Sequence, residues 1–183
     1  MKEIPLTKGK VALVDDADYA ELNKHKWCAH LRGRNWYVTR FDGETQIHMH
    51  RVIKNAPDDK RVDHINGNGL DNQRHNLRIC TQQQNTQNRR KSLHTCSSAY
   101  KGVYKHPCGK YKVTINVDGK NIHGGYWESE IAAAETYDAL ARKHFGEFAN
   151  TNFTLHGTRL VEVDVAGDTP AEDAGLQAAL VAG

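Results

Sequence analysis

Three polar residues in the central part of the chain have the types needed for metal-dependent phosphodiester hydrolysis. Asp63 and His64 are adjacent, and Asn85 follows His64 by 21 residues. An aspartate oxygen and an asparagine carbonyl oxygen suit a hard divalent ion such as Mg²⁺ or Mn²⁺. A histidine is near-neutral at physiological pH and can accept a proton from water, so metal and base together provide what hydrolysis needs. Asn88 lies on the same helical face as Asn85 and stays an alternative ligand.

The segments around these residues predict a strand, a long loop, a second strand and a helix. The strands are residues 61–64 and 77–80, and the glycine- and asparagine-rich stretch 66–69 between them tolerates the positive φ angles of a loop. Thr81 begins the helix, with Gln84 as its capping-box partner. Folding this unit back on itself would bring the helix to the first strand.

The N-terminal residues predict a small sheet with a short helix. We expect strands at 10–14, 36–41 and 45–49, a hairpin turn at 42–43, and a helix capped in the acidic run 15–18 that continues through Leu22. Alternation through His48 and His50 favours a strand with one polar face over a metal site. Arg32, Arg34 and Arg40 make the hairpin region basic, which fits an ordinary sheet or an arm along DNA phosphates.

Residues 99–153 predict a three-stranded sheet backed by one helix. Apolar residues alternate with polar ones over 111–117, residues 118–119 form a tight turn, and 122–127 is the return strand. Residues 101–105 are a candidate first strand. A helix is expected over 130–145, with Ser129 as its N-terminal cap, Gly146 as the C′ residue just after it and an alanine-rich stripe that packs on the sheet.

The charge of the chain indicates a polyanionic partner. Residues 1–153 carry 24 Lys and Arg against 17 Asp and Glu, whereas residues 154–183 carry one Arg against five acids. No apolar run is long enough for a membrane span, and the N-terminus has no secretory h-region, so we expect no membrane partner and an intracellular, cytoplasmic location. No cysteine pair has C-x-x-C spacing, which favours free thiols over a zinc site.

The central stretch resembles the HNH endonucleases, in particular the phage and intron-encoded homing type. The resemblance is carried by Asp63-His64-Ile65-Asn66-Gly67-Asn68, Leu70-Asp71-Asn72, Asn76-Leu77-Arg78 and Gln84-Asn85, with Asn88 after them and His50-Arg51 and 55–57 as a lead-in. It implies a ββα-metal fold with His64 as the general base and Asp63 and Asn85 as metal ligands. Asn76 would fix the loop and orient His64. Asn85 stands where some members have a second histidine, which argues against zinc.

Residues 100–153 resemble the AP2/ERF DNA-binding domain. The matching residues are Tyr100-Lys101-Gly102-Val103, Gly109-Lys110-Tyr111, Ile115, Gly125-Tyr126-Trp127, Ala132-Ala133-Ala134, Tyr137-Asp138 and Asn152-Phe153. The resemblance implies DNA binding through the sheet. Tyr104, Cys108, Thr114 and Asn116 depart from the plant pattern, so the plant recognition sequence does not carry over.

Together these observations predict an α+β protein that is a metal-dependent, site-preferring DNA endonuclease of the homing type. We expect a small-sheet lead-in at 1–55, an HNH ββα-metal core at 56–95, an AP2-like three-stranded antiparallel sheet with one helix at 96–153, and an acidic tail at 154–183. The partner is double-stranded DNA, bound by a monomer. The expected DNA-binding residues are Arg89, Arg90, Lys91, Lys101, Tyr104, Lys105, Lys110, Lys112, Asn116 and His123. A DNA-binding regulator with a silent nuclease unit and a restriction or repair nuclease are the alternatives.

Overall fold

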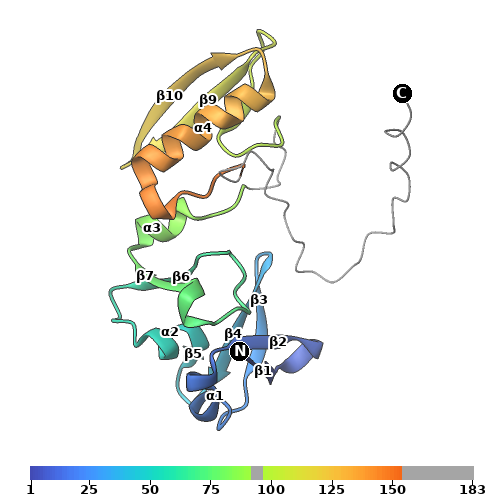
Figure 1. Ribbon diagram of the computed structural model, residues 1–183, viewed down its shortest axis with the longest axis vertical. Coiled ribbons are helices and arrows are strands. Elements are labelled where there is room, and N and C mark those ends of the chain that lie inside the picture. The colour runs from blue at the N-terminus through green and yellow to red at the C-terminus, as the bar shows by residue number, and fades with distance from the viewer. Residues whose placement is uncertain (92–96, 154–183) are drawn as a thin grey trace, which may run out of the picture.

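The computed structural model describes residues 1–91 and 97–153. These residues form two bodies, 1–91 and 97–153, that lie one above the other along the long axis of the molecule, with a short helix, α3, between them (Figure 1). The acidic tail predicted for 154–183 and residues 92–96 of the predicted linker lie outside the described residues.

The first body is built from three small antiparallel sheets and short helices. β1 (Lys2–Pro5) pairs with β2 (Val11–Val14), β3 (Cys28–Arg32) and β5 (Gln46–His48) flank β4 (Asn35–Phe41), and β6 (Arg61–His64) pairs with β7 (Leu77–Cys80). The helices are α1 (Asp16–Leu22), α2 (Met49–Lys54) and α3 (Gln82–Gln87), with 3-10 turns η1 (Thr7–Gly9) and η2 (Arg74–Asn76).

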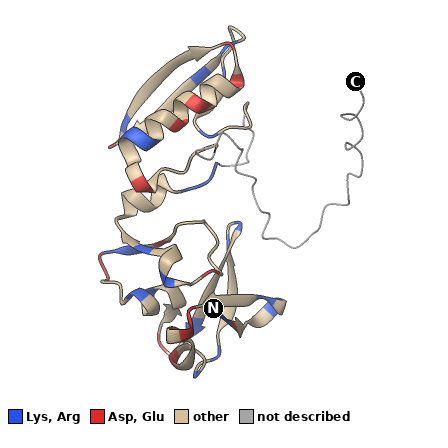
Figure 2. Ribbon diagram, in the orientation of Figure 1, with Lys and Arg blue, Asp and Glu red and all other residues tan. Residues whose placement is uncertain are grey.

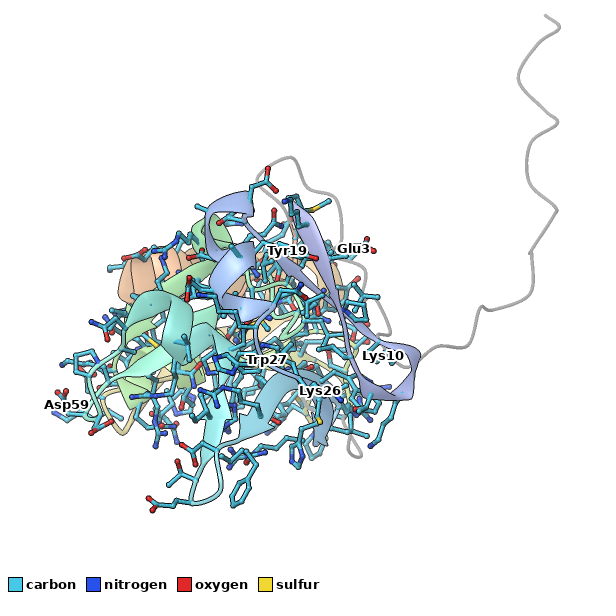
Figure 3. All side chains as sticks on the ribbon, turned by 90° about the horizontal axis from the view of Figure 1, so that it is seen from below. Glu3, Lys10, Tyr19, Lys26, Trp27 and Asp59 are labelled. Atoms are coloured by element: carbon cyan, nitrogen blue, oxygen red, sulfur yellow. The ribbon has the colours of Figure 1, made fainter. Side chains whose placement is uncertain are left out.

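A single hydrophobic cluster holds these elements together. It draws on residues from Ile4 to Leu77 and includes Trp27, whose indole nitrogen donates a 2.8 Å hydrogen bond to the carbonyl of Leu22. Tyr19 packs against the cluster from α1, and Figure 3 shows both aromatic residues in the view from below. Because the cluster takes side chains from 1–55 and from 56–95, the predicted lead-in and nuclease core pack as one body.

The structure differs from the sequence prediction at residues 45–50. A strand was expected over 45–49, but β5 ends at His48 and α2 begins at Met49. Met49 and Ile53 are spaced by one helical turn and both enter the core, and Asn55 ends the helix in the left-handed conformation. The strand expected over 45–49 is therefore confirmed only for Gln46–His48, and the polar alternation does not continue as a strand to His50, which lies on the first turn of a helix.

The unit that contains Asp63 and His64 follows the prediction closely. The strands occupy 61–64 and 77–80, and Asp63 is directly opposite Arg78 in the ladder. Thr81 and Gln84 form the predicted capping box, with each side chain bonded to the other's backbone amide. The helix that carries Asn85 therefore begins at a fixed point, one residue after the second strand.

The loop between β6 and β7 is held against the N-terminal elements. Leu13 of β2 donates to the carbonyl of Leu70 and accepts from the amide of Asn72. At Gly69 a Cβ atom would lie 2.3 Å from the carbonyl oxygen of Trp36, so no larger residue fits this approach to β4. Segments far apart in the sequence thus fix the loop that follows His64.

The second body is a three-stranded antiparallel sheet, β8 (Val103–Lys105), β9 (Tyr111–Val117) and β10 (Lys120–Trp127), with helix α4 (Glu130–Phe145) across one face (Figure 1). The predicted strands, the helix and the turn at 118–119 are confirmed, and the Ser129 hydroxyl accepts from the amide of Ala132. The expected stripe of small residues on α4 packs on Val113 and Ile115. A 3-10 turn, η3 (Gly146–Phe148), follows the helix.

Candidate active site

Asp63 is buried at the end of β6, with its carboxylate held by two neighbours. Arg78 donates to Oδ2 from Nε and Nη2, at 2.9 and 2.8 Å. Asn88 donates from one amide nitrogen to both carboxylate oxygens, at 3.1 and 3.0 Å. Oδ1 therefore accepts only a shared bond among the described residues, which leaves it lone-pair capacity for a cation.

His64 is buried beside Asp63, and its ring is held by Asn72. Its Nε2 lies 3.4 Å from the Asn72 carbonyl oxygen, whose amide orientation is set by a bond from Nδ2 to the Gly69 carbonyl. Because Asn72 presents an acceptor, the proton of the neutral ring belongs on Nε2, and Nδ1 is left free to accept one. Burial lowers the pKa of His64 against the opposing effect of Asn72, so the ring is neutral at physiological pH.

Asn76 makes no hydrogen bond to the His64 ring in the described part of the chain. Its side chain bonds the backbone amide and side chain of Asn66 and the carbonyl of Asp71, each within 3.0 Å. These bonds tie the loop together, which is part of the role that the resemblance implied for Asn76, whereas the residue that bonds the His64 ring is Asn72. The sequence prediction included Asn72 in the motif without giving it a role.

The two candidate asparagines of α3 face different surroundings. Asn88 is buried and directs its amide nitrogen at Asp63 and at the carbonyls of His64 and Ile65. Because four acceptors surround this nitrogen, the side-chain amide is oriented with its nitrogen, and not its oxygen, toward Asp63. Asn85 is only half buried, its side chain makes no hydrogen bond with the described residues, and it lines the same cleft as Asp63 and His64.

Two further histidines extend this site. The rings of His50 and His64 meet edge to face at 5.0 Å, and His48 stacks on His50 at 5.1 Å. Burial lowers the pKa of His50 to about 2 and lowers that of His48 as well, so both rings are neutral. The Nδ1 atoms of both are buried without a hydrogen-bond partner in the described structure.

These residues form one side of a cleft of about 760 Å³ that is strongly basic. Among the described residues that line it, Asp63 is the only carboxylate. Seven cationic side chains face it, namely Arg32, Arg34, Arg51, Arg61, Arg89, Arg90 and Lys91. Figure 2 shows Lys and Arg at the tip of the hairpin formed by β3 and β4, and the cleft also includes the segment just after α3. A cleft of one sign attracts a polyanion.

Comparison with known proteins identifies the family. The HNH endonuclease family model matches residues 54–87, which contain β6, β7 and α3. An uncharacterised HNH endonuclease of Acanthamoeba polyphaga mimivirus is 35% identical over 155 residues, which cover 79% of this chain and 76% of that protein. The chain belongs to the HNH endonuclease family. It is therefore a DNA nuclease, and the match is too long to be confined to the first body.

The cations of this HNH endonuclease differ in how they are used. Arg51 bonds the carbonyls of Lys60, Ala56 and Pro57 and so braces the segment before β6. Three cations of the cleft, Arg32, Arg34 and Arg89, make no side-chain hydrogen bond or ion pair within the described residues. These three are free to meet phosphates. Arg89 is one of the expected DNA-binding residues, and Arg32 and Arg34 belong to the basic hairpin for which an arm along phosphates was one of two interpretations.

Four of the expected DNA-binding residues of the second body share one face of its sheet. Lys112 and Asn116 alternate along β9 with the buried Val113 and Ile115, so they lie on the face away from α4. Tyr104 pairs with Lys112, and His123 of β10 pairs with Thr114, which places both on the same face. The remaining three are placed differently. Lys101 donates to the carbonyl of Gln87, Lys110 lies 3.5 Å from Glu128, and Lys105 is exposed at the end of β8.

The oxygen donors at this site fit a divalent ion whose remaining coordination positions are filled by the substrate. The described residues contain no group of three or more His, Cys, Asp or Glu side chains arranged to hold a metal. One carboxylate oxygen and one amide oxygen suit an ion such as Mg²⁺, which usually takes one or two carboxylates and binds phosphate oxygens for the rest. In the parts of the chain described here, no helix is long and apolar enough to cross a membrane.

Proposed function

We propose that this HNH endonuclease hydrolyses DNA phosphodiester bonds with His64 as the general base and a single divalent ion, Mg²⁺ or Mn²⁺, held by Asp63 and Asn85. The observation that carries the proposal is the adjacency of a neutral imidazole and a carboxylate with an available oxygen on a basic cleft. When bound, the ion would stabilise charge that develops on the phosphate. We also propose that the enzyme acts on DNA as a monomer.

The residues of the chain have distinct tasks in this proposal. His64 accepts the proton of the attacking water at Nδ1, while Asn72 holds its protonated Nε2. Asn88 and Arg78 fix the Asp63 carboxylate from two sides. Arg32, Arg34 and Arg89 bind phosphates along the cleft and place the scissile bond over His64.

The second body would supply DNA docking through its open sheet face. Lys112, Asn116, His123 and Tyr104 gather there, and a polar and basic β-sheet face can enter a major groove. This supports the AP2-like layout and a site-preferring enzyme of the homing type. A restriction or repair nuclease would use the same chemistry with a different choice of target.

Cleavage of supercoiled plasmid with Mg²⁺ or Mn²⁺ tests the chemistry. We expect His64→Ala to lower the single-turnover rate by roughly 10²–10⁴ while DNA binding is retained. Asn85→Ala and Asp63→Ala should both raise the metal concentration required. Near-full activity of His64→Ala would overturn the assignment of the base, and DNA binding by a wild-type protein that never cleaves would favour the silent regulator.

Mapping the cut ends on genomic DNA tests the homing proposal. A homing-type enzyme should cut at one or a few long sites, and Asn116→Ala should relax that preference because a base contact is lost. Cuts spread evenly over the DNA would refute site preference and leave the nuclease chemistry standing.

A further inference from the structure

One guanidinium connects the proposed metal carboxylate to the second body. Arg78 lies opposite Asp63 in the β6–β7 ladder and bonds Oδ2 through Nε and Nη2. Its remaining nitrogen, Nη1, donates to the backbone carbonyl of Glu147, and its guanidinium lies 3.9 Å from the centre of the Phe148 ring. Glu147 and Phe148 belong to η3 of the second body. The Arg78 side chain is 11% exposed, so it is enclosed by these partners.

The contacts with Asp63 determine which carboxylate oxygen is available. Two N–H donors from Arg78 and one from Asn88 occupy Oδ2, whereas Oδ1 receives only the shared bond from Asn88. Two nitrogens of one planar guanidinium that converge on Oδ2 fix the position of that oxygen, and the contact of Asn88 with both oxygens limits rotation of the carboxylate. Arg78 therefore orients Asp63 with Oδ1 left for an ion.

The contacts with η3 determine where the guanidinium lies. Arginine has several rotatable bonds, and its rotamer is held only when its head is fixed at more than one point. The ring face of Phe148 supplies a cation–π contact and shields the guanidinium, and the Glu147 carbonyl receives the third nitrogen. Both points come from a body that holds none of Asp63, His64 and Asn85.

We propose that Arg78 is a positioning residue through which the second body sets the metal carboxylate of the first. The second body then supports catalysis itself, in addition to any part in DNA docking. This inference rests on the proposed role of Asp63 as a metal ligand. Residues that orient metal ligands typically change metal affinity or activity by about 10–100-fold when they are replaced.

Variants on both sides of the junction test the inference in the full-length protein. Arg78→Lys keeps the charge but loses the two-nitrogen fork, and Phe148→Leu removes the ring face without touching the nuclease body's own residues. Phe145→Leu is the matched control, because Phe145 is equally buried at 8% exposure, lies three residues away and packs in the core of the second body. For each we would measure single-turnover cleavage against Mn²⁺ concentration, Mn²⁺ binding from the free-ion EPR signal, and DNA affinity in EDTA.

We expect Arg78→Lys to weaken Mn²⁺ binding and to raise the Mn²⁺ midpoint for cleavage by roughly 10–100-fold. Phe148→Leu should also weaken Mn²⁺ binding and raise the Mn²⁺ midpoint, each by at least about threefold. Its DNA affinity, measured in EDTA, should stay within twofold of wild type. Phe145→Leu should leave the Mn²⁺ midpoint unchanged. A scaffold role alone would lower thermal stability in all three variants without moving the midpoint.

Two results would overturn the inference. The first is a Phe148→Leu protein that matches Phe145→Leu in Mn²⁺ binding and midpoint, and the second is an Arg78→Lys protein with wild-type values. Asp63→Ala separates this failure from that of the proposed function. If Asp63→Ala has lost Mn²⁺ binding while the junction variants are neutral, only the Arg78 inference fails. If Asp63→Ala keeps wild-type Mn²⁺ binding, the proposed ligand is wrong and the inference falls with it.

Discussion

Replacement of Asn88 should separate a structural clamp from a metal ligand. Its amide nitrogen is the donor for the carboxylate of Asp63 and the carbonyls of His64 and Ile65, and the residue is buried. Asn88→Ala leaves those acceptors without this donor, and a buried unsatisfied group costs about 1–3 kcal/mol, more when it is charged. We therefore expect a loss of about 2–3 kcal/mol, which lowers Tm by about 4–12 °C for a protein of this size.

Asn88→Asp should be worse than Asn88→Ala although it changes no volume. It places a carboxylate oxygen where the amide nitrogen lies, 3.0 Å from Asp63 Oδ2 and 3.1 Å from the His64 carbonyl. Arg78 already pairs with Asp63, so the new carboxylate would be buried without a cation of its own, and an uncompensated buried charge costs about 3–5 kcal/mol. Asn85→Ala, in contrast, should change stability by less than about 0.5 kcal/mol, because its side chain has no hydrogen bond to lose among the described residues.

Thermal unfolding followed by circular dichroism, together with the metal titration of cleavage, provides the assay. The reasoning is refuted if Asn88→Ala melts within about 2 °C of wild type, or if Asn85→Ala lowers Tm as much as Asn88→Ala does. A metal requirement that rises only in a well-folded Asn88→Ala protein would make Asn88 the ligand in place of Asn85.

Three further outcomes follow from the described contacts. Replacing both Arg32 and Arg34 by Gln should make the dependence of log K on log salt shallower by about 1.8 units, since each lost phosphate contact removes about 0.9, and an unchanged slope would remove the hairpin from the DNA interface. The pKa of His50 is 6.5 in the unfolded chain and about 2 in the folded protein, so the neutral ring contributes its full share of the unfolding free energy above pH 6.5. Below pH 6.5 this share is lost at about 1.4 kcal/mol per pH unit, because the unfolded chain takes up a proton that the folded protein does not. His50→Gln should flatten this slope in urea unfolding measured at pH 5–7. Gly102→Ala places a Cβ atom 1.9 Å from the buried ring of Tyr137 at a φ of +73°, so unfolding stability should fall by about 2–4 kcal/mol, and a loss under 1 kcal/mol would contradict the packing.

Two internal comparisons control these measurements. Lys24→Gln removes an exposed cation that is paired with Glu21 and does not line the cleft, so it should leave the salt slope unchanged. Gly109 also has a positive φ, but a Cβ added there would have no atom within 4 Å. The stability loss of Gly109→Ala therefore measures the backbone cost alone, and the additional loss of Gly102→Ala measures the cost of the clash with Tyr137.

The elements most visible in the sequence were those whose signals are local. The strands at 61–64 and 77–80, the Thr81 capping box and the helix at 130–145 each follow from a few neighbouring residues, and all are present. The strand expected over 45–49 ends at His48, because the alternation of polar residues there is short. The core contacts of Met49 and Ile53, which favour a helix, depend on the whole fold.

The support of the candidate site depends on contacts that no local pattern reports. Asn72 reaches His64 only because the loop is held against β2, and Arg78 meets Asp63 only in the observed register of β6 and β7. A twelve-residue connection between those strands does not fix their register. The sequence did predict that the two short strands pair, and antiparallel pairing would have placed an arginine near Asp63. It would not have shown that this arginine also bonds η3.

The partners of Arg78 in η3 are also the last part of the site to be synthesised. Asp63 and Arg78 precede the carbonyl of Glu147 by 84 and 69 residues. At about 5–20 residues per second, translation needs roughly 3–14 s to pass from Arg78 to Glu147. Once residue 91 has been made, the nascent first body contains the proposed base, the proposed metal ligand and the residues of the cleft, but Arg78 still lacks its contact with Glu147. The order of translation therefore places completion of the proposed active site after synthesis of the second body.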